Sequence, residues 1–127
     1  MEDCILAYAA GILDGEGCVS ISKAPSGGKF RMRVSIGNND PRMLLFLQEH
    51  FGGSINKFYS GNDVNRPGYM WGVSGSHAGV FLRLIYPYVR CKREQIEVVL
   101  DYLSTSDWNK RTELYERCKK LKKIRFE

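Results

Sequence analysis

Two acids separated by one glycine follow a short apolar run, and they are the residues best suited to chemistry. The segment reads Asp14-Gly15-Glu16-Gly17, and the run before it, Ile5 to Leu13, has the pattern of a buried helix. The last backbone carbonyls of a helix have no partner inside it. Carboxylates beside such carbonyls form a set of hard oxygen donors, the ligands that Mg²⁺ prefers. The sequence therefore predicts a place for a divalent cation at the end of this helix.

Cationic side chains alternate with apolar ones over residues 29–37. Together with the alternating residues 18–23, this pattern predicts a β-hairpin with one apolar and one cationic face. Such a ribbon fits the major groove of DNA, where arginine binds guanine through two hydrogen bonds. The expected DNA-binding residues are Ser20, Ser22, Lys23, Lys29, Arg31, Arg33 and Ser35, with Asn56 and Arg66 extending the surface. A solvated strand face is the alternative, although such faces usually mix charges of both signs.

Charge is unevenly distributed along the 127 residues, whose net charge is +5. Residues 1–21 contain four acids and no base, residues 22–42 five bases and one acid, and residues 90–127 eleven bases and seven acids. An acidic spot between basic segments suits a polyanion that lysine and arginine bind while carboxylates hold a metal ion against it. Ordinary charged surface on a basic protein is the alternative that charge alone leaves open.

The elements that position these residues follow from hydrophobic spacing. Helices are predicted over residues 3–14, 41–51, 76–86, 91–103 and 107–123. Strands are predicted over residues 18–23, 29–37, 54–59 and 69–74. The faces of the last two strands stay open, because Ile55 and Phe58 break the alternation. The order predicts an α+β fold in which an antiparallel meander has helices on one side and an open face on the other.

The nine residues from Ala9 to Gly17 resemble the signature of the LAGLIDADG homing endonucleases. The residues identical to the signature are Ala10, Gly11, Asp14 and Gly17. Ile12 and Leu13 are similar to it, and Glu16 stands as its second acid. Ala9 departs from the signature, since the family usually has a larger apolar residue there, a difference in packing rather than in chemistry.

The resemblance covers about residues 5–103. It includes the order of the elements and three further segments, Asn38-Asn39-Asp40, Phe51-Gly52-Gly53 and Pro87 to Lys92. It implies an αββαββα fold whose saddle-shaped antiparallel sheet carries helices on one face. We expect residues 1–127 to form one domain, with a core over about residues 3–103 and a C-terminal helix over about 107–123.

The resemblance also implies an activity, the Mg²⁺-dependent hydrolysis of double-stranded DNA at a specific site. Glu16 would be the metal-ligating side chain and the Gly15 carbonyl a second donor, whereas Asp14 is assigned a structural role in preference to direct ligation. Lys92 would stabilise charge on the phosphate or organise the attacking water, with phosphate anchoring as the alternative. Asn38 occupies the position of a polar residue, often Gln, that holds solvent near the metal.

Only one such motif is present, and cutting two strands requires two acidic centres. In single-motif members of the family two motif helices pack side by side, so we expect a homodimer. The contact would use small residues that allow close approach of two helices, Ala7, Ala10 and Gly11. The same residues would simply be core in a monomer. A two-fold dimer predicts a palindromic or pseudo-palindromic target.

Several other classes are disfavoured. Four widely spaced cysteines and two histidines predict no zinc site, and reduced thiols fit an intracellular protein, cytoplasmic or organellar. The longest apolar run is far shorter than the roughly 20 residues that span a bilayer. No membrane partner and no small-molecule cofactor are expected. Two rivals remain: a non-cleaving nucleic-acid-binding protein on the same scaffold, such as an intron RNA maturase or a transcriptional regulator, and a protein-interaction domain with an incidental basic face.

Overall fold

The structure is a computed structural model that describes residues 1–24, 29–59 and 67–122. Its helices are α1 (Asp3–Glu16), α2 (Pro41–Phe51), α3 (Gly75–Ile85), α4 (Arg93–Leu103) and α5 (Trp108–Leu121), with the short 3-10 helix η1 (Tyr86–Tyr88). Its strands are β1 (Gly17–Lys23), β2 (Phe30–Asn38), β3 (Ser54–Tyr59) and β4 (Gly68–Ser74). The elements follow the predicted order. Asp40 caps α2 as expected, because its carboxylate accepts the backbone N–H of Arg42 at 2.9 Å.

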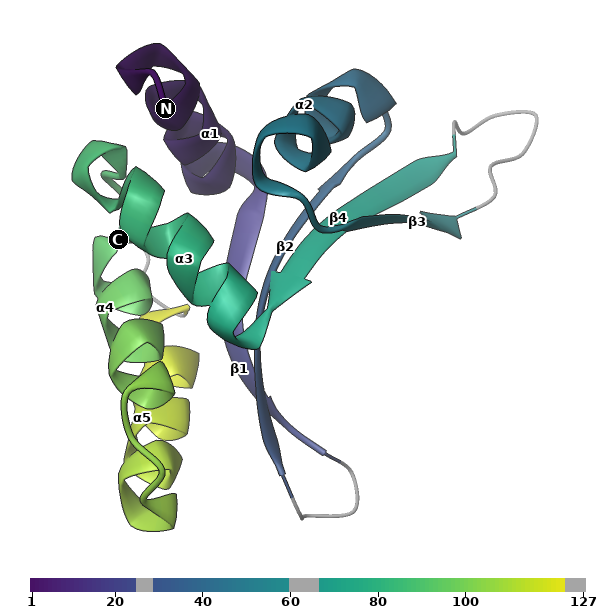
Figure 1. The fold of residues 1–127 in the computed structure, drawn as a ribbon. Coiled ribbons are helices and arrows are strands. Elements are labelled where there is room, and N and C mark those ends of the chain that lie inside the picture. The colour runs from purple at the N-terminus through teal and green to yellow at the C-terminus, as the bar shows by residue number, and fades with distance from the viewer. Residues whose placement is uncertain (25–28, 60–66, 123–127) are drawn as a thin grey trace, which may run out of the picture.

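The four strands form one antiparallel sheet in the order β1-β2-β4-β3. The expectation of a simple meander is wrong, because β4 rather than β3 lies beside β2 (Figure 1). Each of the two α-β-β units contributes its second strand to the centre of the sheet. Val34 faces Val73 and Ile36 faces Trp71 across this central pair. The apolar residues of both units therefore join in a single core.

The helices cover one face of the sheet, and no described element covers the other face (Figure 1). Alternate residues of the strands point toward the helices and are buried, which confirms the predicted apolar face of the hairpin. Trp71 is completely buried, and its indole N–H donates to the Gly52 carbonyl at 2.8 Å. Burying one large apolar side chain contributes about 1.5–3 kcal/mol. The buried layer thus holds the opposite, open face in a fixed shape.

A register shift in β3 explains why its faces are ambiguous in the sequence. The pairing with β4 is irregular between Lys57 and Tyr59, as expected of a β-bulge. Ile55 lies opposite Trp71 and packs against the core, whereas Asn56 lies opposite Met70 and is exposed. Asn56 is therefore on the open face of the sheet.

The four cysteines carry free thiols, as predicted, and Cys118 is the buried one. Its thiol donates to the Val19 carbonyl at 3.8 Å and joins α5 to β1. Within the described ranges, no helix combines the length and the apolar composition that crossing a membrane requires.

Candidate active site

The helix that carries the two acids is longer than its sequence predicts. It continues through Asp14 and Gly15 to Glu16, and neither Gly15 nor Gly17 has a positive φ. Gly17 has a different role at the start of β1. A Cβ at this position would lie 2.4 Å from the Leu13 Cδ1 atom and 2.8 Å from the Leu13 carbonyl oxygen. The strand leaves the helix so closely that only glycine fits.

Asp14 has a structural role at the end of α1, which agrees with the preferred interpretation of its sequence position. Its carboxylate accepts the backbone N–H groups of Arg90, Cys91 and Lys92 at 2.8, 3.0 and 3.2 Å. These residues form the segment between η1 and α4 and are 76 to 78 positions away in the sequence. Asp14 therefore fixes this segment against the motif helix.

Lys92 lies at the same helix end. Its ammonium group donates to the Asp14 carbonyl at 2.9 Å, and the side chain is half-buried. This carbonyl is one of the terminal helix acceptors that have no partner within the helix. A lysine here also balances the partial negative charge at the C-terminus of α1. The contact therefore places the positive charge of Lys92 at the carbonyl of Asp14, two residues before Glu16 in the sequence.

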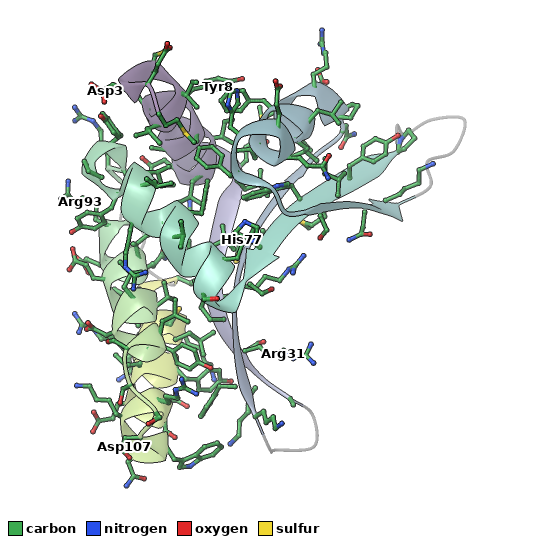
Figure 2. The ribbon with its side chains drawn as sticks, in the orientation of Figure 1. Asp3, Tyr8, Arg31, His77, Arg93 and Asp107 are labelled. Atoms are coloured by element: carbon green, nitrogen blue, oxygen red, sulfur yellow. The ribbon has the colours of Figure 1, made fainter. Side chains whose placement is uncertain are left out.

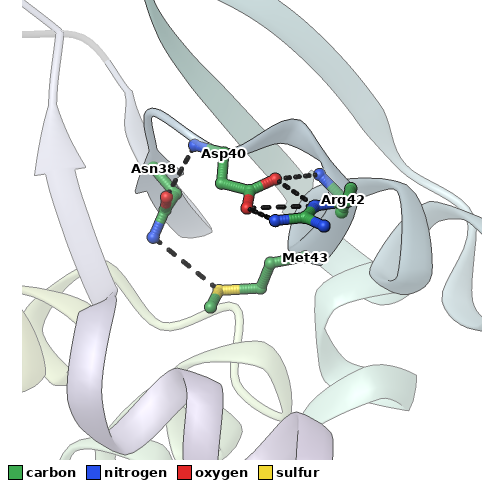
Figure 3. Close-up of polar contacts among 4 residues, drawn as sticks. All are labelled: Asn38, Asp40, Arg42 and Met43. Carbon is green, nitrogen blue, oxygen red and sulfur yellow. Dashed lines mark hydrogen bonds and ion pairs between the residues drawn. The ribbon is translucent and has the colours of Figure 1, made fainter.

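Asn38 reaches Glu16 from the end of β2. Its side-chain N–H group donates to the Glu16 carboxylate at 2.5 Å, so the amide is long enough for this contact despite being shorter than Gln. Its oxygen accepts the backbone N–H of Asp40 at 2.7 Å, and its nitrogen also lies 3.9 Å from the Met43 sulfur (Figure 3). These contacts fix the orientation of the amide, with the nitrogen toward Glu16.

The cap of α2 supports Asn38 from outside the site. Asp40 accepts hydrogen bonds from the Arg42 guanidinium, the shortest at 2.6 Å (Figure 3). This side-chain hydrogen bond raises the pKa of Arg42 above its ordinary value. Both side chains are solvent-exposed to different degrees, so the pair contributes to orientation more than to stability.

The donors at the end of α1 fit a divalent cation that binds protein and phosphate oxygens together. Glu16 supplies one exposed carboxylate, and the Gly15 carbonyl belongs to the same terminal turn. Among the described residues no group of three or more His, Cys, Asp or Glu side chains could hold a metal ion. Magnesium commonly binds through one or two carboxylates together with substrate phosphates. The residues present therefore fit an ion shared with a phosphate rather than a site formed by protein alone.

The exposed stripe of α1 differs from the expected dimer contact at one residue. Ala10 is completely buried within its own chain and is not available to a second chain, so its assignment to the interface is wrong. Besides Asp3 and Glu16 at its two ends, the exposed residues of the helix are Cys4, Ala7, Tyr8, Gly11 and Gly15, spaced as on one helical face. A Cβ at Gly11 or Gly15 would meet nothing within 4 Å. Neither glycine is required by packing inside the single chain.

The open face of the sheet carries most of the expected DNA-binding residues. Cross-strand register places Ser20 beside Arg33 and Ser22 beside Arg31. Arg31 extends from β2 on the side away from α4 and α5 (Figure 2). Ser35 and Asn56 share this face, and Lys29 is exposed immediately before β2.

Lys23 does not lie on the open face of the sheet, contrary to its place in the predicted DNA-binding surface. Its ammonium group lies 5.8 Å from the centre of the Phe30 ring and 5.7 Å from that of the Trp108 ring, on the side of the sheet where α5 packs. Strand alternation accounts for the error, because Lys23 has the parity of the buried Ile21 and not of Ser22. Arg66 lies outside the described residues.

The open face also includes Gly72 and Ser74, which the sequence pattern did not single out. Arg33 donates to the Ser74 hydroxyl at 3.0 Å, and its guanidinium lies against Gly72. Both residues belong to β4, whose faces the pattern left open, so no sequence signal identified them. Gln95 lines a depression of about 470 Å³ beside Lys92, with its side-chain oxygen buried.

Known structures share this fold. The homing endonuclease I-CvuI, in complex with a DNA target in the presence of Mg, matches at a TM-score of 0.77 and 20% identity, over 96% of this chain and 84% of that one. The archaeal intron-encoded homing endonuclease I-Vdi141I, in complex with DNA, matches at a TM-score of 0.73 and 21% identity, over 97% and 85%. The LAGLIDADG homing endonuclease I-SmaMI, bound to cleaved DNA, matches at 0.65 and 20% identity, over 94% of this chain but 43% of that one.

These likenesses establish the fold. The chain has the fold of the LAGLIDADG homing endonucleases, which confirms the fold that the signature implies. No protein-family model matches the sequence, and no curated protein does. The chain covers most of I-CvuI and I-Vdi141I but less than half of I-SmaMI, a chain more than twice the length of the part it matches.

Proposed function

We propose that this chain is a site-specific endonuclease that acts as a homodimer and hydrolyses double-stranded DNA with Mg²⁺. The observation that carries the proposal is the arrangement at the end of α1, where Asn38 contacts Glu16 and Lys92 contacts the Asp14 carbonyl. These residues come from three separate segments of the chain, and the open face of the sheet carries Arg31 and Arg33. The fold is shared with homing endonucleases that were solved with DNA.

The residues of the site have distinct roles in this proposal. Glu16 and the Gly15 carbonyl would hold Mg²⁺, which supplies positive charge to the phosphate oxygens when bound. Asn38 donates to Glu16 and so restricts the orientation of the carboxylate. Lys92, held at the Asp14 carbonyl, offers a positive charge to the phosphate as negative charge builds in the transition state. Asp14 fixes the segment that carries Lys92.

The homodimer supplies the second acidic centre. Glycine inside a helix costs about 0.5–1 kcal/mol relative to alanine. Gly11 and Gly15 face open space within the chain, so packing in the monomer does not account for them. Close approach of a second α1 helix does, because the absence of side chains lets two backbones meet. A two-fold contact there would bring the Glu16 residues of both chains near one axis.

Gly11→Leu is expected to prevent dimer formation while leaving each chain folded. The leucine would enter open space in the single chain but would hold a second helix away. We expect analytical ultracentrifugation to give a monomer for this variant and a dimer for the parent, with unchanged helical circular dichroism. Glu116→Leu, which adds the same side chain at an exposed position of α5, should leave the dimer intact. A dimeric Gly11→Leu variant would contradict the proposed interface.

Arg31→Ala is expected to weaken binding to the selected DNA target by about 1–3 kcal/mol and to relax base preference at one position. Arg31 is exposed on the open face, where a bidentate contact to guanine is possible. Electrophoretic mobility shift on the target and on single-base variants measures both effects. Arg117→Ala removes an exposed arginine from α5 and serves as the control of equal charge. Equal weakening on every sequence would instead identify Arg31 as a phosphate contact.

Selection from a randomised duplex library with Mg²⁺ tests the proposed function itself. The parent chain should enrich duplexes that are cut on both strands, and the recovered sites should be palindromic or pseudo-palindromic. Binding to specific DNA without cutting would favour the rival, a non-cleaving nucleic-acid-binding protein on the same scaffold. Absence of both cutting and DNA binding would contradict both functions.

A further inference from the structure

The guanidinium of Arg33 occupies space that any side chain at position 72 would need. A Cβ at Gly72 would lie 2.1 Å from Nη2 of Arg33, 2.5 Å from Cζ and 3.0 Å from Nε. Gly72 does not have the positive φ that would itself require glycine. What the glycine provides is therefore room for Arg33, whose planar group lies against the backbone of β4.

The Ser74 hydroxyl holds the other side of the same guanidinium. It accepts a hydrogen bond from Nη1 of Arg33 at 3.0 Å, across the pair that β2 and β4 form. Ser74 is also the N-cap residue of α3, a position where serine ordinarily accepts a helix N–H. Its side chain makes no such capping bond here. The hydroxyl therefore holds the Arg33 guanidinium and does not cap the helix.

We propose that Gly72 and Ser74 are positioning residues that fix Arg33 for reading one guanine of the DNA target, an inference that rests on the proposed function. Recognition of guanine by arginine requires two hydrogen bonds in a fixed geometry, and a mobile arginine must lose conformational entropy to form them. Arginine has five N–H donors, and Ser74 engages one of them. The Nη2 group stays available to a base.

The residues next to Arg33 on the open face leave this arginine accessible. They form the adjacent row of cross-strand neighbours. Cross-strand register places four small residues side by side in that row: Cys18, Ser35, Gly72 and Ser54. None of their side chains is larger than that of cysteine. A base edge in the major groove can therefore approach the guanidinium from this side of the sheet.

Binding selection from a randomised duplex library, followed by dissociation constants on single-base variants of the selected site, tests the proposal. Arg33→Ala should lose preference for guanine at one base pair. Gly72→Ala and Ser74→Ala displace or release the same side chain by different routes, so each should lose preference at that same base pair, by about fivefold or more. Ser74→Thr keeps the hydroxyl and should keep the preference. Ser74→Ala should leave the melting temperature unchanged, because it removes no helix cap.

The possible results separate the two levels of inference. If the parent enriches no sequence, the proposed function fails and the positioning role fails with it. If the parent selects a site and Gly72→Ala or Ser74→Ala keeps the full guanine preference that Arg33→Ala loses, the positioning role is overturned alone. The same holds if Arg33→Ala changes no base preference, or if Ser74→Thr loses the preference as fully as Ser74→Ala.

Discussion

Glu16→Gln is expected to abolish Mg²⁺-dependent cutting while DNA binding persists. The substitution removes the charge that would ligate the ion but keeps an oxygen that can accept the hydrogen bond from Asn38. Losing several kcal/mol of charge stabilisation in the transition state lowers the rate by about 10³-fold or more. Glu16 is exposed, so folding should be unaffected.

Single-turnover cleavage and mobility shift on the selected target measure the two properties separately. Glu116→Gln, at an exposed position of α5, changes the net charge equally and should cut at the parental rate. A Glu16→Gln variant that cuts as fast as the parent would remove Glu16 from the active site.

Asp14→Ala is expected to have the largest effect on stability. It deletes the carboxylate that accepts three backbone N–H groups from residues 90–92 and joins α1 to the start of α4. We expect the free energy of unfolding to fall by about 2–4 kcal/mol, because hydrogen bonds to a charged group are strong but water can replace part of them at this half-buried site. Urea denaturation followed by circular dichroism measures the loss.

A graded comparison identifies the cause of this loss. Asp14→Asn retains one acceptor oxygen and should lie between the parent and Asp14→Ala. Asp101→Ala removes an exposed aspartate from α4 and should change stability little. If Asp14→Ala is as stable as the parent, the three hydrogen bonds do not hold the segment that carries Lys92.

Much of the architecture follows from local patterns in the sequence. Strict alternation over residues 29–37 predicts both the strand and its buried face, and the pair Asp40-Pro41 marks the start of α2. These signals are local, because side-chain direction in a strand and capping of a helix depend on neighbours in the chain. The signature around Glu16 likewise predicted the fold.

Other features depend on contacts between distant segments. The position of β4 beside β2 is set by the packing of two α-β-β units, which no local pattern records. Because of the irregular pairing near Lys57, simple alternation in the sequence does not predict which residues of β3 face the core. For the same reason Gly72 and Ser74 gave no signal, since their significance lies in an arginine 39 to 41 positions away.

Two residues were assigned to the wrong face of an element, although the elements themselves were predicted correctly. Ala10 and Gly11 are neighbours in a stripe of small residues, but the helix turns Ala10 into the core and Gly11 outward. Lys23 is one residue beyond Ser22, and a step of one residue along a strand moves a side chain to the opposite face. A rule based on residue type alone does not make these distinctions.

A mixed dimer tests most directly whether two chains each contribute one acid to the cutting of two strands. Parent and Glu16→Gln chains with different affinity tags can be co-expressed, and the heterodimer isolated through both tags. With Mg²⁺ and a plasmid that contains the selected target, the heterodimer should nick one strand, whereas the parent homodimer should linearise the plasmid. Linearisation by the heterodimer at the parental rate would contradict the requirement for two Glu16 residues.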